Sequence, residues 1–342
     1  MPAAQLGQGL TPVTAVGEPA PDLREPLTAP SRFTLRVPAT SANLGPGYDT
    51  LGLALELRDE IRVSASPRQN PESASVEVAV EGEGAASLPT DASHMVVAVV
   101  ERILAAKGYS LPDLRVTATN VIPHSRGLGS SAAAIATAVA TADQLLPQGL
   151  TDDEKLQIGS RIEGHPDNYV PALRGGVAVS WSCGDRESSV YRTAALTPHP
   201  RLSTVVALPD FVQSTQAARD VLPEVIAHQQ AAKNSARAAL LVHALTAAPE
   251  LLLEATEDFL HQEYRREAFP ASMALVDSLR EAGHPAVISG AGPAVLVLTD
   301  SEAAEEAVAH ITEFCLGRAP GDTFIAHNLP IAASGVTVEI SR

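Results

Sequence analysis

The alternation and spacing of hydrophobic residues predict strands and helices that follow one another without a regular repeat. Short apolar runs, or alternating ones such as Val76-Glu77-Val78-Ala79-Val80, predict strands. We expect them at 33–37, 61–65, 76–80, 115–122, 177–181, 204–208, 287–289, 295–298 and 336–340. Apolar residues at helical spacing predict helices over 93–107, from 132 through 142 to near 147, and over 151–163 and 301–316. Much of 223–283 is also predicted to be helical. Elements intermixed in this way are typical of an α+β fold.

Short sequence signals predict one helix start, a domain boundary and an N-terminal extension. Thr151 and Glu154 stand at the spacing of a capping box, which predicts a helix start. Polar residues and prolines gather near 185–200, and 342 residues are enough for two domains. We therefore expect one domain over 32–190 and a second over 191–342. Residues 1–31 hold six prolines and no apolar core, so they are predicted to form a disordered N-terminal extension.

Composition and charge exclude some classes of binding partner for this chain. Its formal net charge of −16 argues against nucleic acid and against anionic membrane surfaces, both of which select basic faces. No apolar run reaches the roughly 18 residues that a membrane span requires. The two cysteines, Cys183 and Cys315, are too few for a metal cluster or a disulfide framework and suggest reduced thiols. We expect a cytoplasmic protein that binds neither nucleic acid nor membrane.

One glycine-rich loop carries the clearest chemical signal. It lies between the predicted strand 115–122 and the helix that starts near 132. Its glycines allow positive φ values that turn backbone N–H groups toward one point, and the helix start adds unpaired donors and a positive dipole end. Such a loop is suited to an anion, most often a phosphate. We expect eleven residues to bind a nucleotide: Pro123, His124, Ser125, Arg126, Gly127, Leu128, Gly129, Ser130, Ser131, Ala132 and Ala133.

The chain has three lysines, Lys107, Lys155 and Lys233, and none lies in or beside this loop. A P-loop or a protein-kinase motif is therefore excluded. A dinucleotide fingerprint is also a poor match, because four residues separate the strand from Gly127. A purely structural turn into a tightly packed helix remains an alternative on the loop alone. If a nucleotide binds, backbone amides, serine hydroxyls and Mg²⁺ must balance its charge.

The loop does not stand alone. Pro-x-x-x-Gly-Leu-Gly-Ser-Ser-x-Ala at 123–133 resembles the second motif of the GHMP kinases. The segment 38–52, which includes Asn43-Leu44-Gly45-Pro46-Gly47-Tyr48-Asp49, closely resembles the first motif of the homoserine kinases within that superfamily. Glu163-Gly164-His165-Pro166-Asp167-Asn168 resembles a further homoserine kinase segment. The glycine-rich turn at 288–295 resembles the third GHMP motif, which supports the phosphate loop, although Ala294 stands where the family more often has serine.

The resemblance covers roughly 32–342 and implies a fold and a reaction. The fold is the two-domain GHMP kinase fold, with an N-terminal domain like ribosomal protein S5 that binds ATP and a C-terminal ferredoxin-like α+β domain. The reaction is ATP-dependent phosphorylation of L-homoserine to O-phospho-L-homoserine, a step of threonine biosynthesis. ATP and Mg²⁺ are the implied cofactors, with Ser130, Ser131 and Glu163 as metal ligands. The resemblance also suggests a homodimer.

The resemblance further assigns the substrate residues: Asn43, Asp49, His165, Asn168, Arg219 and Arg265. In the family an arginine binds the substrate carboxylate, and Arg219 and Arg265 stand in the matching segments. Arginine suits this role because its guanidinium pairs with a carboxylate in bidentate fashion. Arg266 competes with Arg265, and the spacing to Pro270 favours Arg265. Asp167, Thr215 and Arg219 are the expected catalytic residues. Whether Asp167 acts as a general base stays open, because a loose phosphoryl-transfer transition state needs none.

Two other functions remain possible at this stage. A related small-molecule GHMP kinase, such as one for mevalonate, would have little use for two carboxylate-binding arginines beside Asp49. A non-catalytic relative that binds a metabolite would not require an intact loop together with Glu163.

Overall fold

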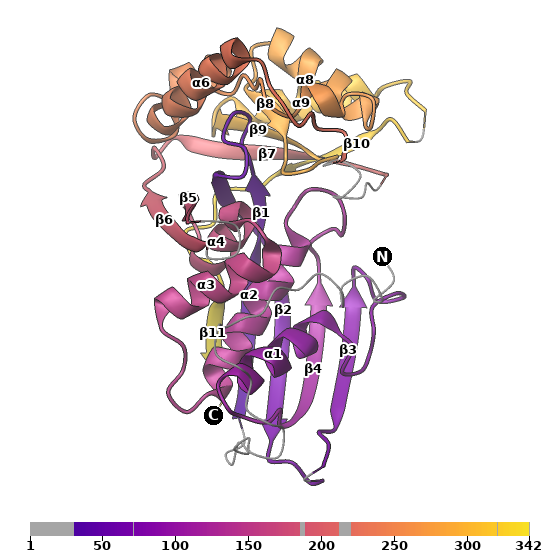
Figure 1. Ribbon diagram of the computed structural model, residues 1–342. Helices are drawn as coiled ribbons and strands as arrows, with labels where there is room; N and C mark the ends of the chain where they lie inside the picture. Colours follow the sequence, from indigo (N-terminus) through magenta and orange to yellow (C-terminus); the bar gives the residue numbers. More distant parts are fainter. Residues whose placement is uncertain (1–30, 71, 185–188, 212–219, 320, 342) are drawn as a thin grey trace.

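The computed structural model describes residues 31–70, 72–184, 189–211, 220–319 and 321–341. They form two α+β units, each built on one sheet (Figure 1). The residues predicted as an N-terminal extension lie outside the described part, apart from Ser31, which opens the first strand. Among the described helices, none combines the length and the apolar character needed to cross a membrane.

The first sheet holds seven strands in the order β11-β1-β2-β4-β3, with β5 paired to β2 and β6 paired to β5. Its strands are β1 (Ser31–Ala42), β2 (Leu51–Ser66), β3 (Val76–Gly82), β4 (Asp113–Asn120), β5 (Val177–Cys183), β6 (Val190–Leu196) and β11 (Thr337–Ile340). Its helices are α1 (Met95–Ala106), α2 (Ser130–Leu145), α3 (Asp152–Glu163) and α4 (Pro166–Arg174). Helix α2 packs on β1, between α1 and α3, and α4 packs on β1 and β2.

The second sheet has the order β10-β7-β9-β8 with every pair antiparallel. Its strands are β7 (Leu202–Pro209), β8 (Ala286–Ile288), β9 (Val295–Asp300) and β10 (Phe324–Asn328). The helices that follow its strands are α6 (His228–Thr246), the short α7 (Leu252–Ala255), α8 (Pro270–Glu281) and α9 (Ala304–Cys315), with 3-10 turns at Pro249–Leu251 and Glu263–Arg265. This β-α-β-β-α-β order confirms the predicted ferredoxin-like domain. In Figure 1, α6, α8 and α9 cover the side of this sheet that faces away from the first sheet.

The structure corrects the predicted domain boundary and several elements. Strand β6 lies beyond residue 190 yet pairs with β5, and β11, near the end of the chain, returns to pair with β1. The first unit therefore takes strands from both ends of the segment 191–342. Strand β1 does not stop at Pro38, because a bulge between Pro38 and Ala39 lets it continue to Ala42. Helix α4 and strands β6 and β10 were not expected from the sequence.

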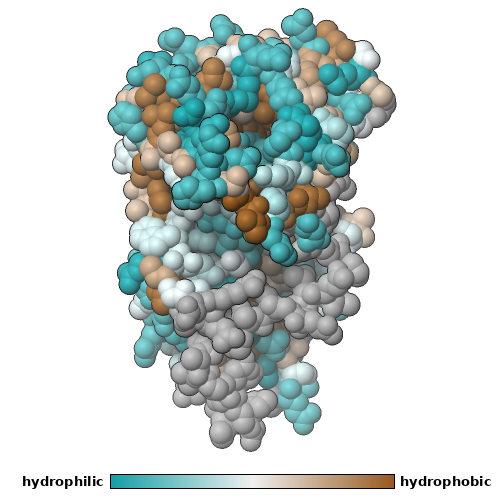
Figure 2. All heavy atoms as spheres, turned by 45° about the horizontal axis from the view of Figure 1, so that its top comes forward, coloured by the Kyte–Doolittle hydropathy of each residue, from teal (hydrophilic) through white to brown (hydrophobic). Residues whose placement is uncertain are grey.

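Most of the core is one continuous apolar cluster that joins the two sheets. It contains residues of β1, α2 and β4 as well as Val206 of β7, Leu241 of α6 and Leu296 of β9. A smaller cluster fills the space between the second sheet and the helices α8 and α9. Seen from the end formed by the second unit, hydrophilic residues predominate and apolar ones gather in separate small groups (Figure 2).

The predicted capping box is confirmed at α3. Thr151 Oγ1 accepts from the Glu154 amide at 3.2 Å, and the Glu154 carboxylate accepts from the Thr151 amide at 2.8 Å. We expect Thr151→Ala to lower the free energy of unfolding by about 1 kcal/mol, and the melting temperature by about 2–4 °C. Thermal melts followed by circular dichroism measure this. Thr312→Ala, at an exposed position inside α9, is the matched control; it should melt at or slightly above the wild type, because alanine is the better helix former and the lost hydrogen bond is the local one to Val308 O. Equal melting of the two variants would contradict a stabilising cap.

Candidate active site

The glycine-rich loop joins β4 to α2 and has the backbone expected of an anion site. Ser125, Gly127 and Gly129 have positive φ values of 56°, 84° and 66°. Residues of left-handed conformation that alternate with ordinary ones turn successive N–H groups to one side. Gly129 is the N-cap of α2 and has no side chain to bind the amides of the first turn. No side chain at the N-cap therefore occupies these amides, and a ligand at the helix start could accept from them.

The turn at 289–294 supports this loop by direct contact. Ser289 Oγ donates to Gly127 O at 2.6 Å and lies 2.8 Å from Ser41 Oγ. The Ala294 amide donates to Arg126 O at 3.1 Å. A Cβ atom added to Gly127 would lie 2.4 Å from Ser289 O, so this glycine is required by close approach as well as by φ. The turn thus fixes the loop from the second unit.

At its other end the loop is anchored by a buried carboxylate that the sequence did not single out. Asp59 Oδ1 accepts from the amides of Val121 and Ile122 at 2.7 and 2.9 Å, where the chain leaves β4. Burial raises the pKa of Asp59 above its usual range, although the two backbone donors oppose this shift. The contact directs the chain into the glycine-rich loop.

Ser131 and Glu163 form a pair that fits a hard cation. Ser131, in the first turn of α2, donates from Oγ to Glu163 Oε2 at 3.0 Å, and Glu163 is the last residue of α3. A carboxylate and a hydroxyl next to a phosphate site are the oxygen ligands that Mg²⁺ takes. Ser130, also predicted as a ligand, opens the same helix turn. The donors present therefore fit Mg²⁺.

The lysines are engaged elsewhere, as expected from the sequence. Lys107 pairs with Glu154, Lys155 Nζ lies 2.8 Å from Asp143 Oδ2, and Lys233 Nζ lies 5.4 Å from the ring centre of Phe259. Each of these contacts is made away from the loop residues 123–133. None of the three lysines is therefore placed to balance a phosphate at the loop, which leaves the backbone amides, the guanidinium of Arg126 and a metal ion at the Ser131–Glu163 pair.

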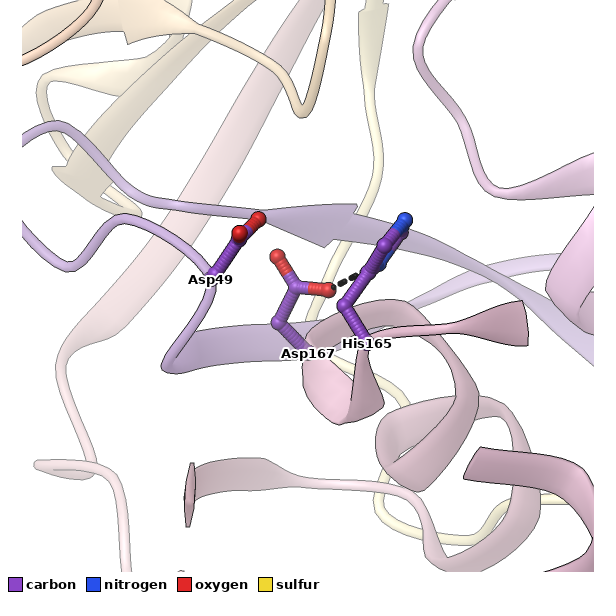
Figure 3. Close-up of side chains that lie close together, drawn as sticks. All are labelled: Asp49, His165 and Asp167. Atoms are coloured by element: carbon purple, nitrogen blue, oxygen red, sulfur yellow. Dashed lines mark hydrogen bonds and ion pairs between the residues drawn. The ribbon is translucent and has the colours of Figure 1, made fainter. Parts of the chain in front are cut away.

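A second cluster of polar side chains lies at the start of α4. Asp49, His165 and Asp167 bring ligand atoms within 4.8 Å of one another (Figure 3). Asp167 is 2% exposed, and its Oδ1 lies 2.8 Å from His165 Nδ1 and accepts from the Asn168 amide at 3.0 Å. Asp167 lies in the first turn of α4, beside the positive end of the helix dipole. Two carboxylates and an imidazole in this arrangement suit an ammonium group and a hydroxyl.

Helix α4 connects this cluster to the phosphate loop. Asn168 Oδ1 accepts from Thr40 Oγ1 at 2.8 Å, and a Cβ atom added to Gly129 would lie 1.9 Å from Thr40 Oγ1 and 3.1 Å from Asn168 Oδ1. Asp167 and Asn168 therefore face the two predicted sites from adjacent positions. Thr40 was not predicted as a site residue, because a lone threonine on a strand carries no recognisable signal.

Asn43 is occupied in holding its own loop. Its Nδ2 donates to Gly290 O at 2.8 Å, and its Oδ1 accepts from the Asp49 amide at 2.9 Å. Both ends of the side-chain amide are thus used to place Asp49 opposite α4. The structure gives Asn43 this positioning contact in addition to the substrate contact expected from the sequence.

Arg265 is the buried arginine of the two candidates. It is 1% exposed, its Nη1 donates to His261 Nδ1 at 2.7 Å, and its Cζ lies 5.9 Å from the ring centre of Tyr48. Arg266 instead forms ion pairs with Glu263 and Asp277 at the surface. Tyr48 and His261 were missed, although the four-residue spacing from His261 to Arg265 was a usable signal. The remaining two predicted residues, Thr215 and Arg219, lie outside the described residues.

Comparison with known proteins supports one family throughout. The family models for the GHMP kinases N terminal domain and the GHMP kinases C terminal match residues 94–176 and 236–316. The chain is 47% identical over 274 residues to the homoserine kinase of Rhodococcus erythropolis. This alignment covers 78% of this chain and 85% of that protein. It is 44% identical over 308 residues to the homoserine kinase of Streptomyces coelicolor, with 89% and 96% covered.

Solved structures agree on the fold. The crystal structure of homoserine kinase from Cytophaga hutchinsonii has a TM-score of 0.76 and 24% identity, with 90% of this chain and 98% of that chain covered. These matches confirm the two-domain GHMP kinase fold implied by the sequence motifs. Given sequence identities of 47% and 44% over most of its length, the chain belongs to the homoserine kinase family of the GHMP kinases.

Proposed function

We propose that this chain transfers the γ-phosphoryl group of Mg-ATP to the side-chain hydroxyl of L-homoserine through the site described above. GHMP kinases use ATP, and membership of the homoserine kinase family assigns the reaction: ATP and L-homoserine give ADP and O-phospho-L-homoserine, a step toward threonine. The mevalonate-type and non-catalytic alternatives are not favoured. The observation that carries the site proposal is the start of α4. There Asn168 contacts Thr40 beside Gly129, and the adjacent Asp167 belongs to the polar cluster.

The nucleotide is proposed to bind through the loop 123–133. The amides of Gly127 to Ser131 and the first turn of α2 would donate to phosphate oxygens. Ser131 and Glu163, with Ser130 beside them, would hold the metal ion. When bound, Mg²⁺ neutralises charge on the phosphate oxygens. The protein would supply position, by orienting the phosphate chain toward Asp167.

Homoserine is proposed to bind by its two charged groups. The carboxylate of Asp49 would pair with the α-ammonium group, and the guanidinium of Arg265 would pair with the α-carboxylate. The side-chain hydroxyl would then lie toward His165 and Asp167. Its oxygen attacks the γ-phosphorus, the bond from that phosphorus to the bridging oxygen of ADP breaks, and the hydroxyl proton leaves. Asp167 would orient this hydroxyl and is the proposed acceptor of its proton.

Three substrates in one coupled assay test this proposal. ADP release is measured with L-homoserine, L-serine and mevalonate at matched concentrations. We expect kcat/KM for serine to be lower than for homoserine by about 10- to 200-fold, because serine lacks one methylene group. Mevalonate should not be turned over, since it would leave Asp49 without an ammonium partner. Faster turnover of mevalonate would support the other GHMP kinase class, and nucleotide binding without any turnover would support a non-catalytic relative.

A further inference from the structure

His261 lies in a turn whose backbone is fixed without help from its side chain. The residue is 1% exposed and sits between α7 and the 3-10 turn that holds Arg265. The Asp258 carboxylate accepts from the backbone amides of Leu260, His261 and Gln262 at 3.0, 3.0 and 2.7 Å. The imidazole ring is therefore placed by the turn and is left to make contacts of its own.

Both ring nitrogens of His261 are used, and their partners determine the tautomer. Nε2 lies 2.8 Å from Gly45 O, which only accepts, and Nδ1 lies 2.7 Å from Arg265 Nη1, which only donates. The ring is thus the neutral form with its proton on Nε2. Burial lowers the pKa of His261, and the charge of Arg265 adds to this shift, although the Asp258 carboxylate, whose Oδ1 lies 3.7 Å from Nε2, opposes it. The imidazole joins a guanidinium to the backbone of the loop that carries Asp49.

That loop has a conformation that needs outside support. Asn43, Leu44 and Asp49 have positive φ values of 69°, 50° and 52°, which are unfavourable for residues other than glycine. Contacts from the second unit hold three successive parts of it. Asn43 Nδ2 donates to Gly290 O, His261 Nε2 donates to Gly45 O, and Asn234 Nδ2 donates to Pro46 O, each at 2.8 Å.

We propose that His261 is a positioning residue that sets the distance between Arg265 and Asp49. This inference rests on the proposed roles of these two residues in binding the α-carboxylate and the α-ammonium group. Because the ring is rigid and hydrogen-bonded at both nitrogens, movement of the guanidinium relative to the loop breaks one of its two contacts. His261 thereby favours substrates that carry an ammonium and a carboxylate on the same carbon.

A matched pair of amide variants separates the two contacts. In His261→Asn the amide takes the place of Nδ1, so an acceptor for Arg265 remains and the donor to Gly45 is lost. In His261→Gln the amide reaches the place of Nε2, so the donor to Gly45 remains and the acceptor for Arg265 is lost. His94→Gln, at another buried histidine, controls for the general effect of replacing a buried imidazole. Thermal melts establish which variants are folded.

Steady-state kinetics with L-homoserine and with 3-aminopropan-1-ol, which lacks the carboxylate, give the readout. In His261→Gln, KM for homoserine should rise by about 10- to 100-fold, the range for a lost hydrogen bond to a charged group. The preference for homoserine over the amino alcohol should fall with it, while kcat and KM for ATP stay within about threefold. His261→Asn should keep more of this preference, and His94→Gln all of it.

Three results would overturn the proposal. The first is an unchanged KM for homoserine in both folded variants at position 261. The second is a rise in KM for ATP that equals the rise for homoserine, and the third is the same loss in His94→Gln. If the wild-type chain does not phosphorylate homoserine at all, the proposed function fails instead, so the two failures are distinguishable.

Discussion

Replacing Glu163 by glutamine is expected to lower kcat for homoserine phosphorylation by about 100-fold or more. Glutamine keeps the size of the side chain and an oxygen that accepts from Ser131, whose Oγ lies 3.0 Å from Glu163 Oε2. It removes the negative charge that a hard cation selects. The Mg²⁺ concentration for half-maximal activity should rise at the same time. A titration of activity with MgCl₂ at saturating ATP and homoserine measures both effects.

Asp152→Asn is the control for this prediction. Asp152 lies at the opposite end of the same helix with its side chain 91% exposed, so the variant makes the same change in net charge on α3. Its kcat and its Mg²⁺ dependence should match those of the wild type. If Glu163→Gln behaved like Asp152→Asn, Glu163 would have no part in holding the metal.

Gly127→Ala is expected to lower kcat/KM for ATP by about 100-fold, which is the cost of misplacing the reacting groups by about 1 Å. The added Cβ would meet Ser289 O at 2.4 Å, a backbone atom that moves only with the supporting turn. The loop must shift or the hydrogen bond from Ser289 Oγ to Gly127 O must break. Either change misplaces the amides proposed to bind phosphate. Fluorescent-nucleotide titration together with the kinetic assay measures the loss.

The control is Gly108→Ala. Gly108 has the same φ of 84° as Gly127, and a Cβ atom there would meet nothing within 4 Å. This variant should lose about 1–2 kcal/mol of stability from the left-handed backbone, and its kcat/KM for ATP should not change. A comparable loss of nucleotide affinity in both variants would show that backbone strain, and not the loop geometry, causes the effect.

The parts of the fold that follow from local chemistry were predictable from the sequence. The capping box of α3, the strands of the core and the glycine-rich loop each depend on neighbours a few residues away. Helix α4 was missed because Gly164 and Pro166 indicate a turn, and Pro171 lies inside it. Strand β6 is mostly exposed and pairs only with β5 among the described strands, so its hydrophobic pattern is weak.

The candidate site also contains residues that the sequence identifies and residues that only the structure reveals. Asp167, Glu163 and Arg265 could be named from their motifs, and the structure gives each a polar partner. Thr40 and His261 could not, because their roles depend on contacts with residues 128 and 216 positions away along the chain. Pattern identifies the residue types that chemistry requires, whereas tertiary packing decides which of them meet.

The central claim is that main-chain amides from Gly127 to Ser131, without a lysine, hold the phosphates of ATP. A crystal structure of the chain with Mg²⁺, L-homoserine and a non-hydrolysable ATP analogue tests it most directly. We expect phosphate oxygens within hydrogen-bond distance of these amides, and a metal ion bound by Ser131 and Glu163. Phosphates held elsewhere, or by a lysine side chain with the loop 123–133 left unbound, would contradict the account.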